Sequence, residues 1–93
     1  MTPEGKVKKE IKDGLTALGA YQFWPVQTGF GKRGIDCYAC YKGRMIGIEA
    51  KRAEGGTVTA IQRQCLYDII TAGGLGIVAR CWEDVRERLP WSP

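Results

Sequence analysis

The sequence predicts an α/β (α+β) fold with the element order α-β-β-β-α-β, a mixed sheet flanked by helices. Apolar side chains recur at helical spacing over residues 3–19 and 60–72. Three segments between these helices, and one after them, are rich in β-branched and aromatic residues. A chain of 93 residues is long enough for a single core, so we expect one domain over residues 1–93.

The first helix has a signal at each end: Thr2 suits the N-cap, Pro3 the first helical position and Gly19 the C-cap. At about 100° per residue, Glu4 lies within roughly 40° of the centre of the apolar stripe and is expected to point toward the domain. Alternatively, Glu4 only complements the helix dipole. The lysines of this helix are expected on the remaining surface, solvated or in contact with phosphates: Lys6, Lys8, Lys9 and Lys12.

The next three predicted strands form an edge strand and a hairpin. Residues 20–27 are expected either at an edge or with a bulge, because Pro25 lacks an N–H. Residues 35–41 and 44–50 flank a two-residue turn, Lys42-Gly43. This turn pairs residues whose numbers sum to 85, so that Asp36 faces Glu49.

The loop over residues 28–34 is rich in glycine and contains Lys32 and Arg33. It lacks the G-K-[ST] ending of a P-loop. Either its glycines let the backbone approach a partner while the two cations contact phosphates, or it is a plain flexible loop.

The second helix begins with a capping box formed by Thr59 and Gln62 and ends at Gly73-Gly74. A right-handed crossover then places residues 75–81 parallel to 44–51, and residues 82–89 form a short helix. We expect one apolar face on the second helix, made by Ile61, Cys65, Leu66, Ile69 and Ile70.

The predicted hairpin brings together an unusual group of charges. Carboxylates placed opposite each other, about 5 Å apart at Cβ, repel unless something offsets them. Lys51 lies two residues beyond Glu49, on the same face. Two acids and an ammonium indicate a divalent-cation site, and replacing Asp36 or Glu49 with alanine is expected to raise the stability of the metal-free protein. The alternative is a solvated hairpin face with a Glu–Lys pair.

Composition excludes several chemistries. The chain has no histidine, which removes histidine bases and histidine metal ligands. Cys37 and Cys40 point to opposite faces of a strand, so we expect four reduced, mostly buried cysteines rather than a zinc site. The net charge of +4 favours an anionic partner. No apolar run is long enough for a membrane span and no signal-peptide pattern is present, which leads us to expect a cytoplasmic protein without a membrane partner.

The motif Gly34-Ile35-Asp36, followed after twelve residues by Glu49-Ala50-Lys51, resembles the PD-(D/E)xK nuclease signature. Gly43-Arg44 before Glu49, and Thr59-Ala60-Ile61-Gln62 after it, are similar to the VRR-NUC branch of that superfamily. The resemblance extends over about residues 3–80 and suggests a stand-alone nuclease of the phage and bacterial type, which would act in the host cytoplasm if phage-encoded. Ile35 departs from the pattern, since the family often has proline there.

This resemblance implies a set of roles. Asp36 and Glu49 would bind Mg²⁺ or Mn²⁺, with the Ala50 carbonyl as a further ligand. Glu4 would complete the metal site, and Gln62 would support it. Lys51 would orient the attacking water and stabilise charge on the phosphate. No small-molecule cofactor is implied. The candidate phosphate-binding residues are Lys6, Lys8, Lys9, Lys32, Arg33 and Arg52.

The function expected from this resemblance is a metal-dependent, structure-selective DNA endonuclease. Stand-alone members resemble Holliday-junction resolvases, so we expect a homodimer acting on branched or junction DNA. Two alternatives remain: a non-catalytic nucleic-acid-binding module of the same fold, and a small interaction protein whose hairpin acids are merely exposed.

Overall fold

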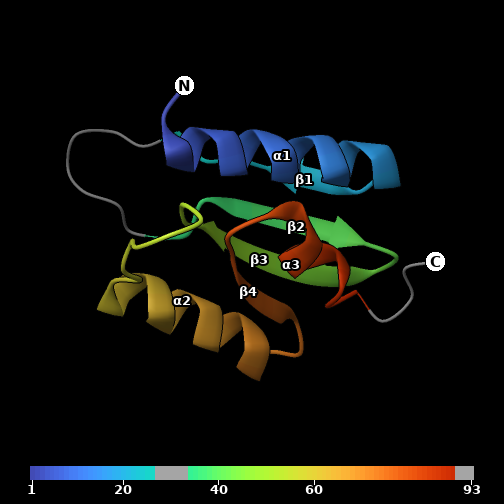
Figure 1. The fold of residues 1–93 in the computed structure, drawn as a ribbon. Coiled ribbons are helices and arrows are strands. Elements are labelled where there is room, and N and C mark those ends of the chain that lie inside the picture. Colours follow the sequence, from blue (N-terminus) through green and yellow to red (C-terminus); the bar gives the residue numbers. More distant parts are fainter. Residues whose placement is uncertain (27–33, 90–93) are drawn as a thin grey trace.

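The computed structural model of the protein describes residues 1–26 and 34–89. Within these residues, the sheet has the strand order β1-β2-β3-β4, with β3 and β4 parallel and the other pairs antiparallel. The predicted element order and mixed sheet are confirmed (Figure 1). The elements are α1 (Pro3–Leu18), β1 (Tyr21–Phe23), β2 (Cys37–Tyr41), β3 (Arg44–Ala50), α2 (Ala60–Thr71), β4 (Leu75–Ala79) and α3 (Trp82–Arg86).

The β2–β3 hairpin has the register that the two-residue turn predicts, from Cys37 opposite Ile48 to Tyr41 opposite Arg44. Lys42 and Gly43 adopt φ angles of 51° and 81°. Two successive left-handed residues make a turn whose twist matches that of the strands. The turn therefore determines which side chains of β2 and β3 share a face.

The main core lies between the sheet and helices α1 and α3. It joins the apolar stripe of α1 to the inward side chains of the sheet, and Ile11, Ile46 and Ile48 are fully buried in it. The ring of Trp82 packs so closely on α1 that a Cβ at Gly14 would lie 2.2 Å from it. Helix α2 lies against β3 and β4, and a Cβ at Gly47 would meet its Ile69 at 2.4 Å.

Some strands are shorter than expected. The first strand comprises only Tyr21–Phe23: residues 24–26 are not in the strand, and residue 27 lies outside the described part of the chain. Its edge position in the sheet is confirmed. Strand β2 begins at Cys37 and β4 ends at Ala79, two residues inside the expected limits in each case.

The predicted apolar face of α2 is buried only in part. Leu66 is buried, but Ile61 and Ile70 are 57% and 50% exposed. Helix α2 packs mainly on β3 and β4, so the two margins of its apolar stripe extend beyond the covered strands. These margins leave apolar surface open to solvent.

The four cysteines are free, as predicted, but Cys37 is the only one of them that is fully buried. Cys40 lies three residues further along the same strand and is exposed, since side chains alternate between faces. Burial raises the pKa of the Cys37 thiol from 9.0 to about 12. Across the described ranges, none of the helices has the length and apolar character to cross a membrane.

Candidate functional site

The predicted acids lie at one end of the sheet. Helix α1 begins there, β2 begins, β3 ends and α2 begins, so residues distant in sequence meet at a common edge (Figure 1). Asp36 directly precedes β2, Glu49 is the last but one residue of β3, and Lys51 directly follows β3. The fold thus collects these side chains at the end opposite the hairpin turn.

Asp36 and Glu49 each bind the backbone of the other's segment. The Asp36 N–H donates to Glu49 Oε1 at 3.1 Å, and the Ala50 N–H donates to Asp36 Oδ2 at 2.8 Å. Asp36 is 4% exposed and Glu49 fully buried. Charged side chains are rarely buried to this extent unless they are paired. The two reciprocal hydrogen bonds hold the carboxylates together where the regular ladder of the hairpin has ended.

Lys51 lies on the same face as Glu49, as the strand period predicts. Its Nζ lies 3.2 Å from Glu49 Oε2, and the two side chains are 10% and 0% exposed. The pair is therefore removed from water. In the protein interior, the attraction between charges is stronger than at the surface. An ammonium held in this way has a defined position at the sheet end.

Lys8 is placed differently from the expectation. Its Nζ lies 3.3 Å from Asp36 Oδ1 and 3.5 Å from Glu4 Oε2. Lys8 therefore belongs to the acidic cluster and not to the outer surface of α1. The contact depends on how α1 packs against the start of β2, which helical periodicity alone does not define.

These lysines change the expected energetics of the carboxylates. Each acid has an ammonium within 3.3 Å and an amide donor, so the predicted repulsion between Asp36 and Glu49 is offset in the metal-free protein. Removing either acid now deprives a lysine of its carboxylate. We therefore now expect alanine at either position to lower the stability of the metal-free protein.

Glu4 points toward this end of the domain but remains at its periphery. Its side chain is 41% exposed, and it connects to Asp36 through the Lys8 ammonium. Throughout residues 1–26 and 34–89, no three or more histidine, cysteine or acidic side chains are grouped closely enough to hold a metal ion. The expected ligands Asp36 and Glu49 are brought together, whereas Glu4 is not drawn into the same group.

Gln62 is buried at the start of α2, 4% exposed. The predicted capping box is formed: Gln62 Oε1 accepts from the Thr59 N–H at 3.0 Å, and Thr59 Oγ1 accepts from the Gln62 N–H at 3.2 Å. In the described part of the chain, the side-chain Nε2 of Gln62 has no hydrogen-bond partner. Buried donors are normally satisfied, so this amide is suited to a water or a ligand.

The other basic candidates lie outside the cluster. Lys6 and Arg52 are exposed, and the Arg52 carbonyl accepts a hydrogen bond from Arg80. Lys9 pairs with Asp13 at 2.8 Å on the exposed side of α1. The two remaining candidates, Lys32 and Arg33, lie outside the described residues. Cations thus flank the beginning of α1 and the segment that follows β3.

The chemistry of these side chains fits a hard divalent cation. Magnesium and manganese prefer oxygen ligands, and magnesium commonly binds through one or two carboxylates while keeping several waters. Asp36 and Glu49 supply such a pair. The Lys8 ammonium already lies beside one of these acids, Asp36, and beside the peripheral Glu4. Any metal must compete with the lysines that already contact these acids.

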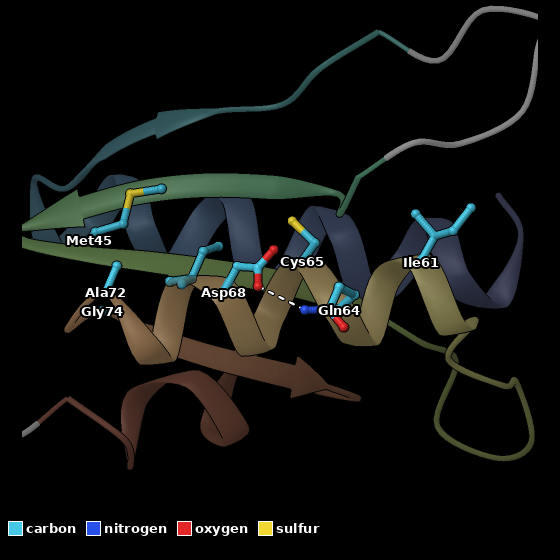
Figure 2. A pocket seen from close by; sticks show the side chains of 8 residues that line it. Met45, Ile61, Gln64, Cys65, Asp68, Ala72 and Gly74 are labelled. Atoms are coloured by element: carbon cyan, nitrogen blue, oxygen red, sulfur yellow. Dashed lines mark hydrogen bonds between the residues drawn. The ribbon is translucent and has the colours of Figure 1, made fainter.

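A groove lies apart from this cluster, between α2 and the sheet. This groove has a volume of about 590 Å³ and is lined by Met45, Ile61, Gln64, Cys65, Asp68, Ile69, Ala72 and Gly74. Figure 2 shows its polar side chains engaged with each other, since Gln64 Nε2 donates to Asp68 Oδ1 at 2.8 Å. Besides these two, the labelled lining has apolar side chains and the thiol of Cys65, which lies 3.6 Å from the Tyr38 hydroxyl.

The role of Lys8 within the cluster was the main feature that sequence reasoning missed. A signal was present, because Glu4 and Lys8 are four residues apart and such residues are neighbours on a helix surface. That spacing, combined with a Glu4 directed toward the domain, would have brought Lys8 to the acids. The pairing with Asp36 had no local signal.

Neither a protein-family model nor a curated protein matches this chain. The functional proposal therefore depends on the geometry and chemistry of the sheet end.

Proposed function

We propose that the protein is a metal-dependent endonuclease that hydrolyses DNA phosphodiester bonds at the Asp36–Glu49–Lys51 cluster. The observation that carries this proposal is the buried Glu49–Lys51 pair beside a second buried carboxylate. Burying three charges at one sheet end is costly for folding alone, and buried charged groups gather preferentially at functional sites.

Asp36 and Glu49 would hold Mg²⁺ or Mn²⁺, with the Ala50 carbonyl as a further ligand. When bound, the divalent ion lowers the pKa of the attacking water and neutralises charge on the phosphate oxygens. Glu49 positions the Lys51 ammonium at 3.2 Å. From there Lys51 orients the attacking water and stabilises negative charge on the phosphate. The buried Gln62 amide supplies a further donor.

Exposed cations would position the DNA backbone. Lys6, Lys9 and Arg52 surround the cluster without entering it, and the chain carries a net charge of +4. Contacts of this kind bind phosphates without selecting a sequence. We therefore propose structure-selective binding of branched or junction DNA. A homodimer would place two active sites about a two-fold axis, as symmetric cutting of two strands requires.

The decisive experiment incubates a labelled four-way junction, a flap, a linear duplex and single-stranded DNA with Mg²⁺, Mn²⁺ or EDTA. We expect cleavage that requires the metal and is abolished by Glu49→Gln, which removes charge but keeps an acceptor for the Asp36 N–H. Lys51→Met should retain DNA binding and lower the cleavage rate by roughly 10²–10³-fold, the usual loss when a charge-stabilising donor is removed. Lys42→Asn is the matched control, since it removes one lysine charge at the hairpin turn, at the opposite end of the sheet, and asparagine tolerates the left-handed backbone there.

A second candidate is a non-catalytic nucleic-acid-binding module. It is favoured by the ion pairs that already engage both acids, and by the absence, within the described ranges, of a third acidic ligand in the group. DNA binding without cleavage of any substrate, in either metal, would establish this alternative. If no DNA binds, both proposals fail and a role in protein interaction takes their place.

A further inference from the structure

We propose that Lys8 is a resident counter-ion of the acidic cluster, which pairs with the proposed metal ligand Asp36 in the metal-free protein and must leave it when the metal binds. This inference rests on the proposed function, because it assigns a role in metal binding at the same site. It makes Lys8 a positioning residue that limits metal affinity, rather than a contact to DNA phosphates.

The first observation in favour of this role is the pair of contacts that Lys8 makes. One ammonium lies 3.3 Å from Asp36 Oδ1 and 3.5 Å from Glu4 Oε2. Both distances lie within the limit for an ion pair, so Nζ bridges an acid on α1 and an acid before β2. An acid of the predicted metal site is thus linked to a peripheral acid by a tethered positive charge.

The second observation is that Asp36 is much less exposed than Lys8 and Glu4. The side chain of Asp36 is 3% exposed, whereas those of Lys8 and Glu4 are 37% and 41% exposed. Asp36 is further held by the Ala50 N–H. When a cation arrives, Asp36 therefore stays in place, and the half-exposed Lys8 side chain can swing into water at small cost.

The third observation is the difference in size between the Lys8 ammonium and a divalent metal ion. Magnesium–oxygen distances are about 2.0–2.1 Å, shorter than either contact of the ammonium. A metal at this position would draw Asp36 and Glu4 closer together than Lys8 does. Glu4 lies in the first turn of α1 with its side chain half exposed, so it is free to make this adjustment. Displacement of Lys8 would bring Glu4 into the ligand set that it only borders in the metal-free protein.

Competition of this kind makes an unusual prediction, because removal of a site residue should strengthen binding. Lys8→Gln removes the competing charge while keeping a polar side chain of similar length. The Lys8 side chain is 37% exposed, so solvent screens its attraction for the buried Asp36, and we expect Mn²⁺ to bind about threefold to tenfold more tightly. A purely structural role for Lys8 would instead weaken metal binding or leave it unchanged.

The experiment measures Mn²⁺ binding by calorimetry, with the metal-induced rise in melting temperature as an independent readout. Four proteins are compared with the wild type: Lys8→Gln, Lys8→Arg, Lys9→Gln and Asp36→Asn. Lys9→Gln is the matched control, since Lys9 pairs with the exposed Asp13 on the same helix. Lys8→Arg keeps the competing charge and should bind Mn²⁺ like the wild type.

Three results distinguish this inference from the function on which it rests. Tighter Mn²⁺ binding by Lys8→Gln, together with unchanged binding by Lys9→Gln and Lys8→Arg, supports the resident counter-ion. Unchanged or weaker binding by Lys8→Gln, in a protein whose Mn²⁺ binding is lost in Asp36→Asn, overturns it and leaves the metal site standing. Mn²⁺ binding that is unaffected by Asp36→Asn overturns the metal site and this inference together.

Discussion

The two faces of strand β3 are buried for different reasons. Ile46 and Ile48 point to the face covered by α1 and α3, where they belong to the buried apolar core. Gly47 and Glu49 point to the other face, where α2 approaches closely over Gly47 and the charged cluster follows at Glu49. Ile48 and Glu49 are adjacent in the chain, and both are fully buried.

This contrast separates two sources of stability within a single strand. The free energy of burial on the Ile48 face comes from removing apolar surface from water, and it depends mainly on volume and shape. Burial on the Glu49 face depends on pairing, because a charge without its partner is unfavourable in the interior. A substitution that keeps the volume would therefore be tolerated on the first face and not on the second.

The largest effect is expected on the charged face. Glu49→Ala leaves the Lys51 ammonium, 10% exposed, without its carboxylate, and should lower the free energy of unfolding by about 3–5 kcal/mol. Urea denaturation at neutral pH measures this change. Adding Lys51→Met to Glu49→Ala should recover part of the loss by removing the unpaired charge. A loss below about 1 kcal/mol would mean that the Glu49–Lys51 pair contributes no more than an ordinary surface ion pair. The contrast between the two faces of β3 would then be wrong.

A loss of similar kind but different origin is expected on the apolar face. Ile48→Ala removes buried methyl and methylene groups and leaves a cavity, so the free energy of unfolding should fall by about 2–5 kcal/mol. Met45→Ala is the matched control on the opposite face of the same strand, where the side chain is 42% exposed. It should change the stability by no more than about 0.5 kcal/mol. Equal losses for the two variants would contradict the assignment of the faces.

The last effect is absent at neutral pH, appears only in alkali and concerns the two cysteines of β2. Burial raises the Cys37 pKa from 9.0 to about 12, so above pH 9.0 the unfolded state loses this proton while the folded state retains it. The contribution to stability is complete below pH 9.0 and should be lost at about 1.4 kcal/mol per pH unit as the pH rises toward about 12.

Denaturation at several pH values above 9.0 measures this slope, and variants identify its source. Cys37→Ala should flatten the pH dependence relative to the wild type, whereas Cys40→Ala should leave it unchanged because Cys40 is exposed. If the slope is the same in all three proteins, the alkaline loss belongs to groups other than Cys37.

Local rules in the sequence were sufficient for much of the fold. Lys42-Gly43 predicted the hairpin register, and the capping box of Thr59 and Gln62 predicted the start of α2. The alternation of side chains along a strand predicted that Glu49 and Lys51 share one face. These features follow from the two-residue period of strands and from capping chemistry, which act over a few residues.

Other features were decided by tertiary packing alone. The contact between Lys8 and Asp36 depends on the angle at which α1 crosses the start of β2, and the exposure of Ile61 and Ile70 depends on which strands α2 covers. Neither the crossing angle of α1 nor the set of strands that α2 covers is a local property, since both result from packing whole elements around one core. The sequence alone therefore determined which side chains share a face, and the tertiary structure decided which charges meet across elements.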